Sequence, residues 1–197
     1  MTESSGFTRR HFLTVATAVT AGAGAAATAV PFVKSFRPSA RAQALGAPVE
    51  RDVSKLEPGA MVKVEWRGRA IFIVRRTDAM LASLGSDLDL LEDPNSEEVE
   101  QQPDYAANQY RSIRPEYLVV EGVCTHLGCA PTARFEMGPA DLGADWPGGF
   151  LCACHGSKFD LAGRVFKSVP APANLKVPPH RYVNDTTILI GVDSGSA

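Results

Sequence analysis

Most of the chain alternates short hydrophobic segments with turn residues, which is the pattern of β-strands. Residues 61–66 and 70–74 are two such segments, and the turn residues Arg67-Gly68-Arg69 between them predict a hairpin. Further strands are expected at 117–121 and, as a closing hairpin, at 182–183 and 187–190. From residue 49 onward we therefore predict an all-β fold.

One segment within this region has a helical pattern instead. Residues 77–84 begin with a Thr cap, continue with hydrophobic residues at helical spacing and stop before Gly85. From Thr77 to Tyr110 there is no Lys or Arg, while acidic residues accumulate: Asp87, Asp89, Glu92, Asp93, Glu97, Glu98, Glu100 and Asp104. Such a run is usually a solvated surface, and docking of a basic partner is the alternative.

The N-terminus carries an uncharged stretch from Phe12 to Val33 that is rich in Ala, Thr, Gly and Val. As a helix rising about 1.5 Å per residue it is long enough to cross a membrane, although Pro31 is expected to end or kink it. Arg9 and Arg10 stand just before it, as in the twin-arginine signal for export. We predict a retained anchor, and cleavage near Ala42-Gln-Ala44 is the alternative.

These features divide the chain into four expected parts. They are a cytoplasmic twin-arginine segment at 1–11, a transmembrane anchor at 12–33, a linker at 34–48 and an exported domain at 49–197. The small residues of the linker cannot build a core, so it is expected to be mobile, as a spacer or a hinge. A net charge of −2, without a basic run that contains aromatics, argues against a nucleic-acid partner.

All four cysteines and two of the four histidines lie in two short boxes, which indicates a metal site, a disulfide or both. Box one is Cys124-Thr-His126-Leu-Gly-Cys129, and box two is Cys152-Ala-Cys154-His155-Gly-Ser157. Attached haem needs C-x-x-C-H and a thioredoxin-like pair needs C-x-x-C, and the boxes have neither spacing. Zinc bound by two Cys and two His is chemically possible, but the C-x-H spacing fits it poorly and two cysteines would be left over.

The two boxes resemble those of the Rieske iron–sulfur family, whose disulfide-carrying branch has C-x-H-x-G-C and C-x-C-H-x-S. The sequence matches every position of both motifs. The resemblance implies a two-iron, two-sulfide cluster with two thiolates on one iron and two imidazoles on the other. Mapped onto this sequence, the implied ligands are Cys124 and Cys152 for one iron, and His126 and His155 for the other. The resemblance further implies a disulfide between Cys129 and Cys154, which suits an exported domain.

The resemblance extends beyond the boxes to the Rieske subunits of bacterial ubiquinol–cytochrome c reductases. It is carried by residues 114–121, 145–149, 159–166 and 170–179. The implied fold is an antiparallel β sandwich with a cluster-binding subdomain and one N-terminal transmembrane helix. The implied activity is that of an electron-transfer subunit, which takes one electron from quinol and passes it to a cytochrome c-type haem subunit.

The same resemblance implies partners, a location and a motion. The partners are a cytochrome b subunit with its quinol, the haem subunit and the membrane, in a dimeric multi-subunit complex. The location is the bacterial inner membrane, with the Rieske domain on the periplasmic side. The domain is expected to swing between the two redox partners, with the linker as the hinge.

Individual residues take expected roles from the family. His155, together with His126, is expected to contact the quinol hydroxyl, and His155 to accept its proton. Leu127 is expected to shield the cluster, and Ser157 to donate a hydrogen bond to a bridging sulfide. Phe159 departs from members that have Tyr there, whose hydroxyl bonds a ligating thiolate, so a lower potential is expected.

Three further expectations concern the surroundings of the boxes. Gly128 and Gly156 are expected to permit tight turns. The segment Pro170-Ala-Pro172 resembles the proline loop that covers the cluster in relatives, and its restricted backbone suits a rigid lid. His180 lies outside both boxes among prolines, where we expect a surface residue rather than a ligand.

Two other functions remain open at this point. The small Rieske subunit of an exported molybdenum oxidase, such as arsenite oxidase, would share the leader but pair with a molybdopterin subunit. A ferredoxin that serves a ring-hydroxylating oxygenase would lack both the leader and the extra cysteine pair. The proline-rich segment after box two and the 77–110 insertion favour the quinol complex.

Overall fold

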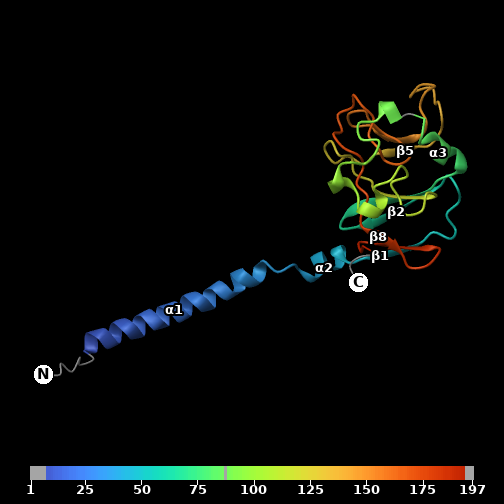
Figure 1. Ribbon diagram of the computed structural model, residues 1–197. Helices are drawn as coiled ribbons and strands as arrows, with labels where there is room; N and C mark the ends of the chain where they lie inside the picture. The colour runs from blue at the N-terminus through green and yellow to red at the C-terminus, as the bar shows by residue number, and fades with distance from the viewer. Residues whose placement is uncertain (1–7, 87, 194–197) are drawn as a thin grey trace. The chain divides into compact units, whose positions relative to one another are not determined.

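The computed structural model describes residues 8–86 and 88–193, and the chain divides into two compact units, Met1–Ala44 and Leu45–Ala197. The first seven residues of the predicted twin-arginine segment, Asp87 of the acidic run and the last four residues of the predicted domain lie outside the described residues. In its described part, the second unit contains three antiparallel sheets of three strands each (Figure 1). The prediction of an antiparallel all-β fold is confirmed.

The middle sheet has the order β2-β3-β4, with β2 at Met61–Trp66, β3 at Arg69–Arg75 and β4 at Tyr117–Glu121. The hairpin between β2 and β3 turns at Arg67 and Gly68, which both have positive φ, at 51° and 71°. Such a two-residue turn matches the twist of the paired strands. The predicted hairpin and the predicted strand at 117–121 are therefore both confirmed.

Side chains alternate between the two faces of the middle sheet, and along most of β3 and all of β4 both faces are buried. Ile71, Ile73 and Val119 pack into one hydrophobic core with the residues of β8 and β9. Phe72 and Val120 pack into a second core, which contains the two cysteines that do not form the disulfide. The middle sheet thus lies between the other two sheets, as the order β8, β2, β5 in Figure 1 shows.

The second sheet has the order β1-β9-β8, with β1 at Val49–Asp52, β9 at Thr187–Ile190 and β8 at His180–Tyr182. The predicted closing hairpin is confirmed, since Tyr182 pairs with Ile188 across it. Strand β1 was not predicted, because three of its four residues are charged and exposed. The strand forms because its backbone hydrogen-bonds to β9 near the far end of the chain, and not because of a hydrophobic alternation of its own.

The third sheet has the order β5-β6-β7, with β5 at Thr132–Arg134, β6 at Gly149–Cys152 and β7 at Ser157–Phe159. Strand β6 ends at the first residue of box two and strand β7 begins at its last, so the box is the turn of a hairpin. At Gly149 any Cβ would collide with the Phe159 carbonyl oxygen, so only glycine fits this close strand approach.

The insertion between β3 and β4 begins with α3 at Asp78–Ser83, which Thr77 caps and Leu84 ends, as predicted. Three short 3-10 helices follow: η1 at Leu88–Leu90, η2 at Val99–Gln101 and η3 at Asp104–Ala106. The acidic side chains of this stretch are mostly exposed, while several of its backbone groups bond to the segment that follows β7. This exposure agrees with the predicted solvated surface, and the alternative, docking of a basic partner, stays untested.

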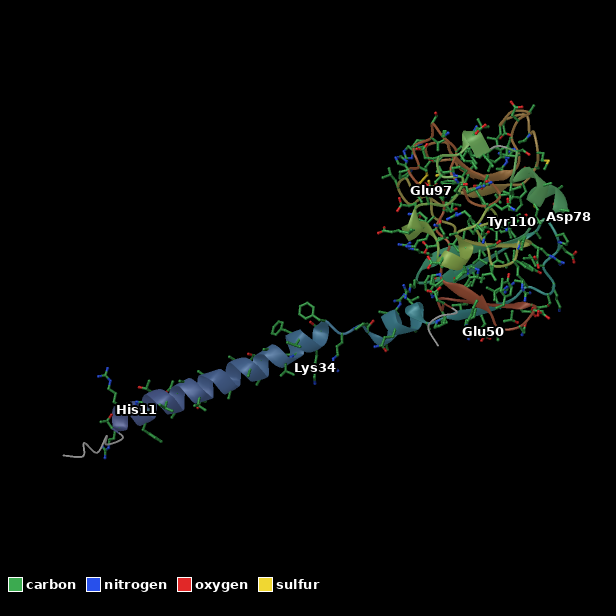
Figure 2. All side chains as sticks on the ribbon, viewed as in Figure 1. His11, Lys34, Glu50, Asp78, Glu97 and Tyr110 are labelled. Carbon is green, nitrogen blue, oxygen red and sulfur yellow. A yellow bond between two sulfur atoms is a disulfide. The ribbon has the colours of Figure 1, made fainter. Side chains whose placement is uncertain are left out.

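In the first unit, α1 covers Arg9–Ser35, and by length and composition it is apolar enough to cross a membrane. Its side chains between His11 and Lys34 are mostly short (Figure 2). The helix continues through Pro31, because a proline removes the hydrogen bond of its own N–H while the other bonds of the neighbouring turns remain. Of the two expected effects of Pro31, the end of the helix is therefore wrong, and the kink stays a prediction.

Two further differences from the sequence-based picture concern the linker and His180. Helix α2, at Ala40–Gly46, occupies much of the expected linker without burying a residue, and the hinge role of that linker stays a prediction. His180 is only 1% exposed, so its expected surface position is wrong. Its backbone N–H donates to the Tyr105 hydroxyl at 2.8 Å, and its Nδ1 lies 2.8 Å from the Pro178 carbonyl oxygen. With these partners, burial costs the histidine little in lost hydrogen bonds, while desolvation lowers its pKa.

Candidate metal centre

The two boxes fold into matching turns. In box one the Gly128 N–H donates to the Cys124 carbonyl oxygen at 2.9 Å, and in box two the Gly156 N–H donates to the Cys152 carbonyl oxygen at 2.9 Å. Both glycines have positive φ, 84° and 77°, which a residue with a Cβ rarely adopts. The expected tight turns at Gly128 and Gly156 are therefore confirmed. Each turn begins at a cysteine and carries one histidine of the expected ligand set.

The free thiols of the two turns face each other in the protein interior. Cys124 and Cys152 are each 2% exposed, and the two side chains are close enough to hydrogen-bond. Burial raises the pKa of the Cys124 thiol; the His126 backbone N–H opposes this rise, Cys152 adds to it and the Ser157 hydroxyl opposes it. A metal that displaces the thiol proton would find two sulfur ligands side by side.

The two imidazoles lie next to each other on the outer side of the thiols. The ring centroids of His126 and His155 are 4.8 Å apart, with the rings nearly perpendicular. His126 is half-buried, whereas His155 is exposed to solvent. One imidazole of the pair is therefore open to a substrate.

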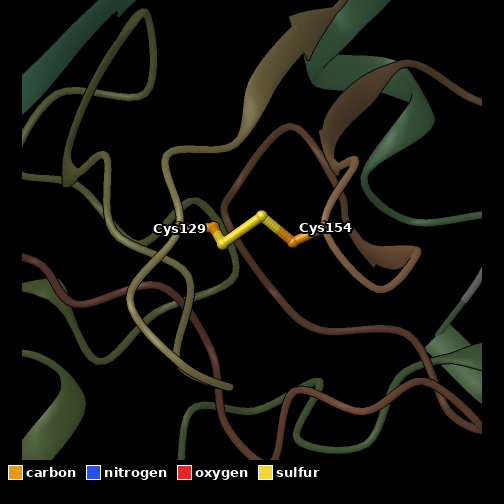
Figure 3. The surroundings of a disulfide bond; sticks show 2 residues. All are labelled: Cys129 and Cys154. Carbon is orange, nitrogen blue, oxygen red and sulfur yellow. A yellow bond between two sulfur atoms is a disulfide. The ribbon is translucent and has the colours of Figure 1, made fainter.

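The other two cysteines form a disulfide, Cys129–Cys154, which links box one to box two (Figure 3). Three sulfur atoms, those of Cys129, Cys152 and Cys154, lie within 4.8 Å of one another. This group is not a metal site as it stands, because two of its members are oxidised to each other and have no thiolate to offer. The disulfide leaves Cys124 and Cys152 as the available thiols among the cysteines.

The predicted proline loop at Pro170-Ala-Pro172 continues to Asn174, and this longer segment, called the proline loop from here on, is hydrogen-bonded to both boxes. The Ala171 N–H donates to the Ser157 hydroxyl oxygen at 3.1 Å, and the Thr125 hydroxyl donates to the Ala173 carbonyl oxygen at 2.6 Å. The sequence analysis missed Thr125. Its position between a cysteine and a histidine of the ligand set was the signal that could have pointed to it.

The structure places the remaining predicted site residues at different depths. Ser157 is fully buried beside Cys124, and Phe159 is fully buried in the same hydrophobic core as both free thiols. Leu127, in contrast, is 73% exposed at the tip of box one, and its shielding role stays a prediction. Leu127 directly follows the half-buried His126 in box one, and this apolar and polar pair forms an amphipathic tip, which suits a partly apolar substrate.

The donor set fits a mixed-ligand iron–sulfur cluster and does not fit a four-thiolate cluster. Two thiols and two imidazoles converge from two facing turns, and a disulfide removes the cysteines that a four-thiolate cluster would need. The same set has the chemistry for tetrahedral zinc, which makes the comparison with known proteins informative.

Two family descriptions match the chain. Residues 48–179 match the Rieske [2Fe-2S] domain, and residues 1–39 match the twin-arginine (TAT) signal of the ubiquinol–cytochrome c reductase Fe-S subunit. Among curated proteins, a ubiquinol–cytochrome c reductase iron–sulfur subunit of Allochromatium vinosum is 62% identical over 96% of this chain and 91% of its own length. The protein of the same description from Blastochloris viridis is 44% identical over 93% of each chain.

Proposed function

The chain belongs to the family of Rieske iron–sulfur subunits of ubiquinol–cytochrome c reductases, and from that premise we propose which residues carry out its function. Cys124 and Cys152 hold one iron of a two-iron, two-sulfide cluster, and His126 and His155 hold the other. The observation that carries this proposal is the convergence of two buried thiols and two adjacent imidazoles from facing turns.

As the electron-transfer subunit of the cytochrome bc complex, the protein accepts one electron from quinol and passes it to a cytochrome c-type haem subunit. When bound, a cluster with two neutral imidazole ligands supplies an electron acceptor at roughly −150 to +300 mV, against about −400 mV for plant-type four-cysteine clusters. The higher range suits the oxidation of a quinol. The relatives at 62% and 44% identity favour this complex over a molybdenum oxidase.

His155 has the exposure that the quinol reaction needs. A histidine that binds metal through one ring nitrogen keeps the other free for a hydrogen bond. We propose that this free nitrogen of His155 binds the quinol hydroxyl and accepts its proton, while the half-buried His126 completes the amphipathic tip with Leu127. Ser157 and the proline loop hold the two turns in place from behind.

Coupling of the electron to a proton on the imidazole predicts a pH-dependent midpoint potential. Where the oxidised protein has lost the imidazole proton and the reduced protein retains it, the midpoint should fall by about 59 mV per pH unit. A redox titration followed by circular dichroism, from neutral to strongly alkaline pH, measures the slope. A midpoint that stays constant through the alkaline range would refute proton acceptance by the ligand imidazoles.

Phe159 gives a second prediction about the potential. A tyrosine at this buried position would add a hydroxyl to the core that contains both thiols. One hydrogen bond of about 1.4 kcal/mol to a ligating sulfur favours the reduced cluster, so Phe159→Tyr should raise the midpoint by about 60 mV. Phe150, the cross-strand partner of Phe159, offers a matched control. Phe150→Tyr adds a hydroxyl to the same core, but not at the position where other family members carry the tyrosine, so its midpoint should stay at the wild-type value. An unchanged or lower midpoint for Phe159→Tyr would contradict the prediction.

The subunit is a membrane-anchored exported protein of the complex, and we propose the finer arrangement. The anchor is retained at the bacterial inner membrane, with the Rieske domain on the periplasmic side. Its direct partners are cytochrome b with its quinol and the haem subunit, in a dimeric complex. The export signal, the apolar helix α1 and the disulfide support this arrangement, since structural disulfides persist in oxidising compartments.

Electron paramagnetic resonance on reduced membranes, together with purification of the complex, tests the whole proposal. A Rieske-type signal that co-purifies with b- and c-type haems is the expected result. A Rieske signal that co-purifies with a molybdopterin subunit and no cytochrome b would instead establish the molybdenum oxidase. Absence of any paramagnetic signal from the reduced, iron-replete protein would end the proposal.

A further inference from the structure

We propose that Asn174 is a positioning residue that fastens the proline loop to the acidic insertion, and that the insertion thereby braces both ligand turns. The inference rests on the proposed function only in that the turns hold the cluster. It assigns a role to a buried side chain and to an insertion that the electron-transfer chemistry itself does not require.

The insertion runs along both ends of the proline loop. Before the loop, the Glu92 N–H donates to the Val165 carbonyl oxygen at 3.0 Å, and the Lys167 N–H donates to the Leu90 carbonyl oxygen at 2.8 Å. After the loop, the Val177 N–H donates to the Gln101 carbonyl oxygen at 2.8 Å. Backbone hydrogen bonds to the insertion therefore hold the proline loop at both of its ends.

Asn174 links the two ends of the proline loop to the insertion. Its side chain is fully buried, its Oδ1 accepts from the Val165 N–H at 2.8 Å, and its Nδ2 donates to the Asp93 carbonyl oxygen at 3.0 Å. The partners fix the orientation of the amide, because an N–H requires the oxygen and a carbonyl requires the nitrogen. One side chain therefore joins the end of the loop, the segment before it and the insertion.

Hydrogen bonds of Asp93 and Arg111 fix the conformation of the insertion next to Asn174. The Asp93 carboxylate accepts from the Glu97 and Glu98 backbone N–H groups, at 2.8 and 3.2 Å, and so closes a turn of the insertion. Arg111 is fully buried, and its guanidinium donates to the Leu175 carbonyl oxygen at 2.8 Å and to Gln102 Oε1 at 3.0 Å. The brace is thus a network of polar groups that hold one arrangement, in which the Arg111 Nε is the member without a hydrogen-bond partner among the described residues.

From Asn174 the path to the ligands is short. Ala173, its neighbour, accepts the Thr125 hydroxyl of box one, and Ala171 donates to Ser157 of box two. A displaced loop would release both bonds together. Water and chelators would then reach the two turns, and the Ser157 hydroxyl beside Cys124 would change its hydrogen bonding.

The test uses the membrane-bound complex with Asn174→Asp. This variant replaces the donor amide with an oxygen that faces the Asp93 carbonyl oxygen and, where the amide nitrogen now lies 3.4 Å from it, the Asp93 carboxylate, so repulsion replaces the hydrogen bond. Asn108→Asp is the matched control, because Asn108 also accepts one backbone N–H and donates to carbonyls, but its three bonds stay within residues 105–112. We measure cluster bleaching by a chelator, the paramagnetic line shape and the melting temperature. Loss of a buried hydrogen bond predicts about tenfold faster bleaching and an altered line shape for Asn174→Asp only.

The outcomes separate the two proposals. Equal bleaching of the two variants, or bleaching of Asn174→Asp at the wild-type rate, would overturn the positioning role. If Asn174→Asp does not assemble, Asn174→Ser is assessed in the same way, since its shorter side chain withdraws from both Val165 and Asp93 without adding a charge. If the wild-type complex itself has no Rieske signal, the proposed function fails, independently of the brace.

Discussion

Replacing His155 with alanine is expected to abolish the Rieske paramagnetic signal and to reduce quinol–cytochrome c reductase activity to background. A cluster with two thiolates and two imidazoles has no spare ligand in the two turns, because the remaining cysteines are tied up in the disulfide. Loss of an outer-shell partner of a metal ligand already costs about 10- to 100-fold in affinity or activity, so loss of a ligand should cost more. Reduced membranes examined by electron paramagnetic resonance, with activity measured alongside, provide the readout.

His180→Gln is the matched control for this experiment. His180 is a buried histidine of the same domain but lies outside both boxes, against Tyr105 and the Pro178 carbonyl oxygen. We expect this variant to melt at a lower temperature and to keep the line shape of the wild-type cluster. A His155→Ala protein that retains the signal would remove His155 from the ligand set.

Removing the disulfide, through Cys129→Ala together with Cys154→Ala, is expected to produce the largest loss of thermal stability among these variants. The bond joins residues 25 positions apart, and closing a loop of this length stabilises the folded state by about 3–4 kcal/mol in the chain-entropy account. For a domain of this size, the melting temperature should fall by about 10 °C. The cluster should bleach faster, since the two ligand turns lose their covalent link.

A thiol reductant supplies the control for the disulfide prediction. Reductant should lower the melting temperature of the wild-type domain toward that of the double variant, while the double variant itself should not respond. Calorimetry on the purified domain with and without reductant measures both. A double variant that melts close to the wild type would show that the ligand turns are held mainly by hydrogen bonds.

Much of the fold could be predicted where a short stretch carries its own signal. The β2–β3 hairpin follows from two alternating segments and a Gly-containing turn, and α3 follows from the Thr77 cap and its hydrophobic spacing. Both signals are complete within about a dozen residues, because strand alternation and helix capping are local geometry. The spacing within each box is local in the same sense.

Other features could not be predicted from the sequence, because they depend on partners that are far away in the chain. Strand β1 is polar and exists by pairing with β9 at the other end of the domain. His180 seemed suited to the surface, yet it is buried because Tyr105, 75 positions earlier, meets its backbone N–H. No local pattern contains these partners.

The sequence by itself determined that cysteines and histidines gather in two boxes and that an export signal precedes an apolar helix. Its resemblance to the Rieske family added which of these residues bind iron and which two cysteines form a disulfide. The tertiary structure alone decided how those groups are held. The proline loop lies against both turns, and Asn174 reaches Asp93 across 81 positions. The physical reason is that ligand chemistry is a property of side chains in short motifs, whereas burial and long-range hydrogen bonds depend on which distant segments pack together.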